Sequence, residues 1–150
     1  MAVFLADEQD LPVDADDLLA LARHVVAQQR IPEDMQLSLL LVDRATIASM
    51  NAEHLGKQGP TDVLAFPIDE PGESPPDAPA VLGDVVLCPA VADEQAPRLG
   101  RTRQEELRLL TVHGILHLIG MDHADPGAER EMFGLTDELL ASYAASRAEP

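Results

Sequence analysis

The strongest helical pattern in the chain is TRQEELRLLTVHGILHLIGMDH, residues 102–123, which also holds three of the five histidines. A helix with one buried face is predicted over residues 102–119, because apolar residues recur there at helical spacing. Gly120 follows, and glycine readily adopts the left-handed conformation that ends many helices. We therefore expect one long helix to dominate the second half of the chain.

The first half has the pattern of a small sheet with two helices. Short apolar runs bounded by charged or turn residues predict strands at residues 36–42, 62–66 and 81–87, with a further edge strand at residues 3–5. Amphipathic spacing predicts helices at residues 15–29 and 44–55, and Asp43 is placed to cap the second of them.

Beyond these strands the pattern is helical. We expect a short helix through Arg98, the long helix at residues 102–119 and a last helix at residues 128–145. Strands in the first half and helices in the second favour an α+β fold over alternating β-α-β units. The prediction is a small mixed sheet of three or four strands packed with about five helices.

A single domain over residues 1–150 fits the length of the chain, which is sufficient to bury its own core. Residues 69–79, DEPGESPPDAP, combine proline, acids and small residues and are expected to form a mobile loop. Cys88 is the only cysteine, so an intrachain disulfide is excluded. The acidic first residues and the short apolar runs favour a cytoplasmic protein without a membrane span.

The formal charge of −17 argues against a broad nucleic-acid surface, since phosphates are normally met by clustered cations. One local exception exists, a cluster formed by Arg98, Arg101, Arg103 and Arg108. Glu105 and Glu106 lie within this cluster, so a solvated helix face with internal ion pairs is its simplest interpretation.

His113, His117 and His123 have the spacing of a metal site. Four residues bring His117 back to within about 40° of His113 and one helical turn along, so both imidazoles can face one ion. A chain reversal at Gly120 could return His123 to the same point. Three imidazoles with a fourth position open are typical of catalytic zinc, because structural sites close all four positions. We predict one zinc per chain.

The same stretch matches the metzincin peptidase frame of three histidines and a glycine, with one exception. The residue after the first histidine is Gly114, where those peptidases carry the glutamate that takes a proton from zinc-bound water. A peptidase of that type is therefore disfavoured. Zinc-assisted hydrolysis of another substrate stays open, because the metal itself activates water and offsets charge on a phosphoryl oxygen.

HGILHLIGMDH resembles the signature of the YbeY family, in which Gly114 is the expected residue. PTDVLAFP, residues 60–67, and Gly83-Asp84 with residues 85–87 resemble two further motifs of that family. The resemblance implies a similar fold, zinc bound by His113, His117 and His123, and a metal-dependent, single-strand-specific endoribonuclease. It implies action in ribosomal RNA processing, notably at the 3′ end of small-subunit RNA, and in ribosome quality control.

One position departs from this family: Leu55 occupies a place where many members carry a functional arginine. Lys57, two residues further and the only lysine, is the nearest candidate for a contact with substrate phosphate. Expected partners are single-stranded or ribosomal RNA and the small ribosomal subunit or an assembly protein. Two alternatives stay open, a zinc peptidase or amidohydrolase and a non-catalytic assembly factor with structural zinc. The general base is not identified.

Overall fold

The structure, a computed structural model, describes residues 2–71, 80–122 and 124–148. Its elements in chain order are β1 (Ala2–Glu8), α1 (Ala15–Gln28), β2 (Met35–Val42), α2 (Arg44–Leu55), β3 (Val63–Pro67), β4 (Ala80–Leu87), α3 (Pro89–Gln95), a 3-10 turn η1 (Ala96–Leu99), α4 (Arg103–Leu118) and α5 (Pro126–Ala148). The predicted elements are confirmed, although β1 and α5 are longer than expected.

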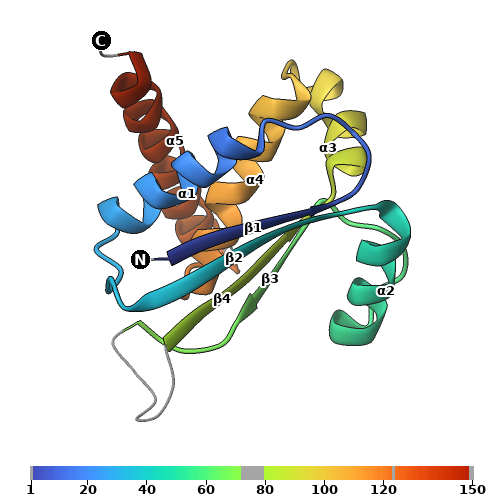
Figure 1. Cartoon of the computed structure of the whole chain (residues 1–150), viewed down its shortest axis with the longest axis horizontal. Coiled ribbons are helices and arrows are strands. Elements are labelled where there is room, and N and C mark those ends of the chain that lie inside the picture. Colours follow the sequence, from blue (N-terminus) through green and yellow to red (C-terminus); the bar gives the residue numbers. More distant parts are fainter. Residues whose placement is uncertain (1, 72–79, 123, 149–150) are drawn as a thin grey trace.

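The four strands form one mixed sheet in the order β1-β2-β4-β3 (Figure 1). β1 pairs with β2 and β2 with β4 in parallel, whereas β3 runs antiparallel to β4 at the other edge. The α+β prediction with a mixed sheet and five helices is therefore confirmed, and β1 is the expected edge strand. None of the described helices is long and apolar enough to cross a membrane.

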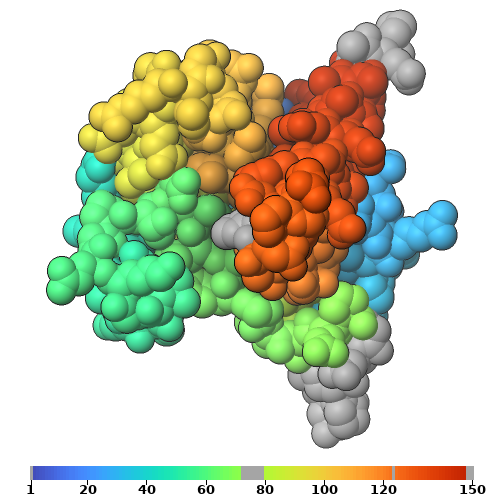
Figure 2. Space-filling model, turned by 180° about the vertical axis from the view of Figure 1, so that it is seen from behind, coloured from blue at the N-terminus to red at the C-terminus, as the bar shows by residue number. Residues whose placement is uncertain are grey.

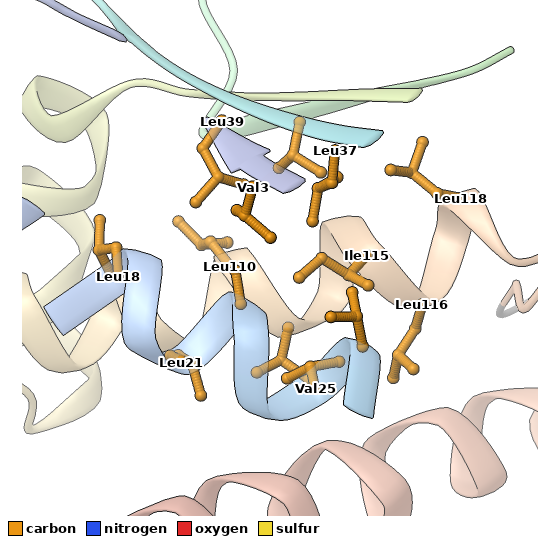
Figure 3. Close-up of a cluster of buried hydrophobic side chains, with 14 of the residues drawn as sticks. Val3, Leu18, Leu21, Val25, Leu37, Leu39, Leu110, Ile115, Leu116 and Leu118 are labelled. Atoms are coloured by element: carbon orange, nitrogen blue, oxygen red, sulfur yellow. The ribbon is translucent and has the colours of Figure 1, made fainter. Parts of the chain in front are cut away.

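The main core lies between one face of the sheet and helices α1 and α4, with α5 packed behind them. Figure 3 shows Val3, Leu37 and Leu39 pointing from the strands toward Leu110 and Ile115 of α4. These side chains are almost completely buried, so the apolar residues of α4 face the sheet as their helical spacing predicts. A smaller cluster joins α2 to the opposite face of the sheet.

Both ends of α4 are fixed by hydrogen bonds. Thr102 and Glu105 form a capping box, in which each side chain accepts a hydrogen bond from the backbone N–H of the other. At the C-terminal end, Gly120 has φ +97°, and the N–H groups of Gly120 and Met121 donate to the carbonyls of His117 and Leu116. This is a Schellman motif, which confirms the predicted reversal at Gly120.

The predicted loop at residues 69–79 begins with an ordered residue. The N–H of Asp69 donates to Val81, and its carboxylate accepts from the N–H of Val81, both at 2.8 Å, so Asp69 extends the β3–β4 pairing. Residues 72–79 lie outside the described part of the chain, and their mobility stays a prediction.

Candidate metal centre

His113 and His117 lie one turn apart on α4, near the end that the Schellman motif fixes. Both side chains are partly exposed, whereas the helix positions between them are buried against the core. The two imidazoles therefore lie at the border between the packed face of α4 and the surface. This placement agrees with two ligands on one helix, as the spacing predicts.

His123, the third predicted ligand, lies outside the described residues. Within residues 2–71, 80–122 and 124–148, no three His, Cys, Asp or Glu side chains come together in a group that could hold a metal ion. The donor set of His113 and His117 suits zinc, because neutral imidazole is among its preferred ligands. Zinc binding by His113 and His117 stays a prediction, because a zinc ion requires at least one further protein ligand besides these two imidazoles.

Gly114 packs directly against β4, which explains its identity. A Cβ atom at this position would lie 2.5 Å from Cγ1 and 3.1 Å from Cγ2 of the buried Val85. Real Cβ atoms do not approach neighbours this closely, so a larger residue requires the helix or the strand to shift. A glutamate in the peptidase position has no room here, which supports the sequence argument against a metzincin-like peptidase.

A cavity of about 660 Å³ adjoins His113. Side chains from α3, η1, the turn after η1, α4, α5 and the segment before β3 line it, among them Asp62, Arg98, Arg101, Glu106 and Phe133. Figure 2 shows the surrounding hollow between the yellow surface of α3 and η1 and the orange surface of α5. The ring centroids of Phe133 and His113 are 5.2 Å apart, so an aromatic side chain borders the candidate metal centre.

Charges in this cavity are partly compensated. Glu106 is 2% exposed, and its Oε1 accepts from Nη1 of Arg101 at 3.4 Å, while its Oε2 has no hydrogen-bond partner among the described residues. Asp62 accepts from the N–H of Val63 at 2.8 Å and from Gln95 at 3.1 Å. Both oxygens of Asp62 and one oxygen of Glu106 are thus engaged by protein donors, and Asp137 adds a third carboxylate to the lining.

One of the ion pairs expected within the arginine cluster is present, and two of its arginines pair instead with acids outside the cluster. Arg101 pairs with Glu106, Arg103 with Asp93 at 2.8 Å and Arg108 with Asp17 at 2.6 Å. The pairs of Arg103 and Arg108 join α4 to α3 and to α1. The cluster therefore links helices as well as forming a solvent-exposed face.

Lys57 lies at the turn after α2, exposed, with its backbone N–H bonded to Asn51. The residues that line the cavity beside His113 do not include Lys57 or Leu55, which is 53% exposed. His24 contacts Ser142 at 2.7 Å, and the ring of His54 lies against Phe66. These two histidines have structural contacts, in line with their exclusion from the predicted metal site.

The sequence did not point to Phe133 as a site residue. It lies on α5 beside the buried Met132 and is 41% exposed, and it borders the cavity rather than the core. A signal was available, because an aromatic residue next to the buried stripe of a helix is a candidate for a binding surface.

Replacement of His113 and His117 tests the metal assignment. We expect about one zinc per chain in protein purified without added metal, and less than a tenth of that in a His113→Ala, His117→Ala double variant. Elemental analysis measures the content, and a His24→Ala variant is the matched control that keeps it. An unchanged zinc content in the double variant would exclude these residues as ligands.

Comparison with known proteins gives one consistent family. A model of the family described as Endoribonuclease YbeY matches residues 4–144. An Endoribonuclease YbeY from Acidothermus cellulolyticus is 54% identical over 154 residues, covering 98% of this chain and 94% of that protein. A protein of the same name from Salinispora tropica is 48% identical, with 98% and 99% covered.

The fold agrees with a solved structure of similar size. The solution structure of TM1509 from Thermotoga maritima matches with a TM-score of 0.65 and 26% identity, covering 99% of this chain and 93% of that chain. The family match extends over nearly the whole chain and includes both described histidines of α4. This chain therefore belongs to the endoribonuclease YbeY family.

Proposed function

We propose that this protein is a metal-dependent endoribonuclease that cleaves single-stranded RNA and acts in ribosomal RNA processing. The observation that carries the proposal is the pair His113 and His117 on α4, beside a cavity of about 660 Å³, in a chain of the endoribonuclease YbeY family. Processing of the 3′ end of small-subunit RNA and ribosome quality control are the specific roles that we expect.

His113, His117 and His123 are the residues that would hold zinc. Bound zinc would supply an activated water molecule with a pKa near 7 and a positive charge close to a phosphoryl oxygen. The chain itself contributes a rigid support, because α4 is capped at both ends and packed on the sheet between them. Such support keeps two imidazoles in a fixed relative position, which favours binding over rearrangement.

A peptidase or amidohydrolase is a weaker candidate. The contact of Gly114 with Val85 leaves no room for the glutamate that metzincin peptidases use. An assembly factor with structural zinc also fits the acidic charge, because −17 disfavours unaided contact with RNA. We expect a small-subunit or assembly partner to act with this protein in the cytoplasm. Lys57 stays a candidate phosphate contact, although it does not line the cavity beside His113.

Digestion of single-stranded RNA tests the proposal. The zinc-loaded protein is expected to cut a single-stranded RNA, to leave the same sequence intact in a duplex and to leave casein intact. His117→Ala should lower the cleavage rate at least 100-fold, since loss of a ligand removes the activating ion. His54→Ala, which leaves α4 unchanged, is the control and should cleave like the unmodified protein. Equal cleavage by His117→Ala would refute the hydrolytic role of the site.

A further inference from the structure

A second cavity, of about 330 Å³, continues from the one beside His113 along α4 and α5. Arg101 and Leu109 line both cavities, so the two adjoin at these residues. Arg108, Tyr143 and Arg147 line the second cavity. Both volumes fall in the usual range for ligand pockets, about 300 to 1,000 Å³.

Cations are concentrated along this path. Arg98, Arg101, Arg108 and Arg147 line the two cavities, and the whole chain has ten lysines and arginines. Five carboxylates line the same path, Asp17, Asp62, Glu105, Glu106 and Asp137, so the four arginines bring its formal charge to −1 in a chain of −17. Whether this path can bind an anion therefore depends on which of these charged groups already have partners within the protein.

Acids also line the path, but most of them already accept hydrogen bonds. Asp17 accepts from Arg108, Tyr143 and Gln104, and Glu105 accepts from the backbone of Thr102. Asp62 accepts from Val63 and Gln95, and one oxygen of Glu106 accepts from Arg101. Donors within the protein therefore engage these four carboxylates, which reduces their repulsion of a bound anion.

The arginines retain free donors by contrast. A guanidinium carries five N–H groups. Within the described part of the chain, Arg98 has no ion pair or hydrogen bond, and Arg147 has only a stacking contact, 5.6 Å from the Tyr143 ring centroid. Arg108 uses its Nε for Asp17. Donors of this kind match phosphate oxygens in geometry and charge.

Aromatic rings accompany the arginines. Phe133 and Tyr143 line the path, although the chain has only three Phe, one Tyr and no Trp. The ring of Phe133 is partly exposed and lies beside His113. Arginines that follow a backbone and aromatic rings that stack on bases are the two usual components of a site for single-stranded nucleic acid.

We propose that the two cavities form one groove for single-stranded RNA, in which Arg98 and Arg147 contact backbone phosphates and Phe133 stacks on a base next to the scissile position. This inference rests on the proposed function and adds the course of the substrate across α4 and α5. It places the main phosphate contacts at the arginines rather than at Lys57, which lines neither cavity.

The test is the salt dependence of RNA binding. A labelled single strand of about 12 nucleotides, 2′-O-methylated and checked on a gel to remain intact, is titrated by fluorescence anisotropy between 50 and 300 mM salt. Each lost phosphate contact lowers the slope of log affinity against log salt by about 0.7 for a single strand. Arg98→Gln with Arg147→Gln should therefore lower the slope by about 1.4 and weaken binding at 50 mM salt at least tenfold.

Two further variants separate the contributions. Arg30→Gln removes an exposed charge that lines neither cavity, and it should leave the slope unchanged. Phe133→Leu should weaken binding roughly fivefold to a hundredfold without changing the slope, because stacking does not release counterions. Melting temperatures of all variants should stay within about 2 °C of the unmodified protein, since these side chains are exposed.

The groove is refuted if the Arg98→Gln, Arg147→Gln protein keeps the original slope, or if Arg30→Gln lowers the slope equally. Lys57→Gln gives a direct comparison: a larger fall in slope with Lys57→Gln than with the double variant also refutes the groove. Cleavage by His117→Ala is measured separately. Retained cleavage in that variant refutes the proposed function, whereas unchanged binding by the groove variants refutes only the inference.

Discussion

Asp17→Ala is expected to lower the free energy of unfolding by about 3 kcal/mol, because this carboxylate links three helices. Asp17 lies in the first turn of α1, is 2% exposed and accepts hydrogen bonds from Arg108 of α4 and from Tyr143 of α5, at 2.6 and 2.7 Å. Its removal leaves the buried hydroxyl of Tyr143 with only the backbone carbonyl of residue 17 as acceptor. Thermal melting should show a fall of roughly 6 to 12 °C.

The effect should depend on pH. Burial alone would raise the pKa of Asp17, but hydrogen bonds from Arg108, Tyr143 and Gln104 together hold it below its ordinary value. A carboxyl group whose pKa is lowered on folding stabilises the protein above its unfolded pKa, near 3.9, and this stabilisation is lost as the pH falls through the folded pKa. The difference between the original protein and Asp17→Ala should therefore be constant from pH 5 to 7 and shrink below about pH 4.

Asp16→Ala is the matched control for this experiment. Asp16 lies in the same first turn of α1 and is exposed, so its replacement should change stability by less than about 0.5 kcal/mol. The same network raises the pKa of Tyr143 to about 12, with burial as the main cause and the bond to Asp17 second. A Tyr143 that titrates at its ordinary pKa, near 10, would contradict this arrangement.

Gly114→Ala is expected to destabilise the domain by about 2 kcal/mol, although alanine favours helix over glycine by about 1 kcal/mol. The new Cβ would meet both methyl groups of Val85, and this side chain is completely buried, so its rotation is hindered by close packing. Gly114→Glu should prevent folding at 37 °C, because it adds a buried charge to the same clash. Chemical denaturation measures the first change and circular dichroism the second.

A double variant identifies the cause. Val85→Ala removes the clashing methyl groups, so Gly114→Ala with Val85→Ala should cost at least 1 kcal/mol less than the sum of the single variants. Gly134→Ala is the control, since this α5 glycine has no atom within 4 Å of an added Cβ and should gain about 0.5 to 1 kcal/mol. Additive effects of Gly114→Ala and Val85→Ala would show that the contact is not the reason for glycine at this position.

Much of the fold could be predicted because the local signals agree with one another. Asp43 caps α2 through the N–H of Thr46 at 2.8 Å, and Gly120 ends α4, both as their residue types indicate. The class, the four strands and the family were also predicted correctly. The N-terminal strand was underestimated, because the polar residues that extend β1 to Glu8 give no strand signal of their own.

The site could be predicted only where its residues are close in sequence. His113 and His117 share one helix, so their relation follows from helical geometry. The groove brings together residues from Arg98 to Arg147 on three elements, and Arg101 joins its two parts. Such proximity depends on how α4 and α5 pack, which no local pattern contains. The contact between Gly114 and Val85 is similar, since 29 positions separate its partners.

The strand order also affects a chain that is still being synthesised. β4, which pairs with β2 in the centre of the sheet, ends at Leu87, but α4, which covers that face, ends only at Leu118. At about 5 to 20 residues per second, the ribosome needs roughly 2 to 6 s to add the intervening thirty or so residues. During these seconds the part of the apolar face that α4 covers, over β3 and β4, lacks this cover, whereas α1 has already been synthesised. The excess of acidic residues then acts as protection, because neighbouring nascent chains of like charge repel one another before the cover arrives.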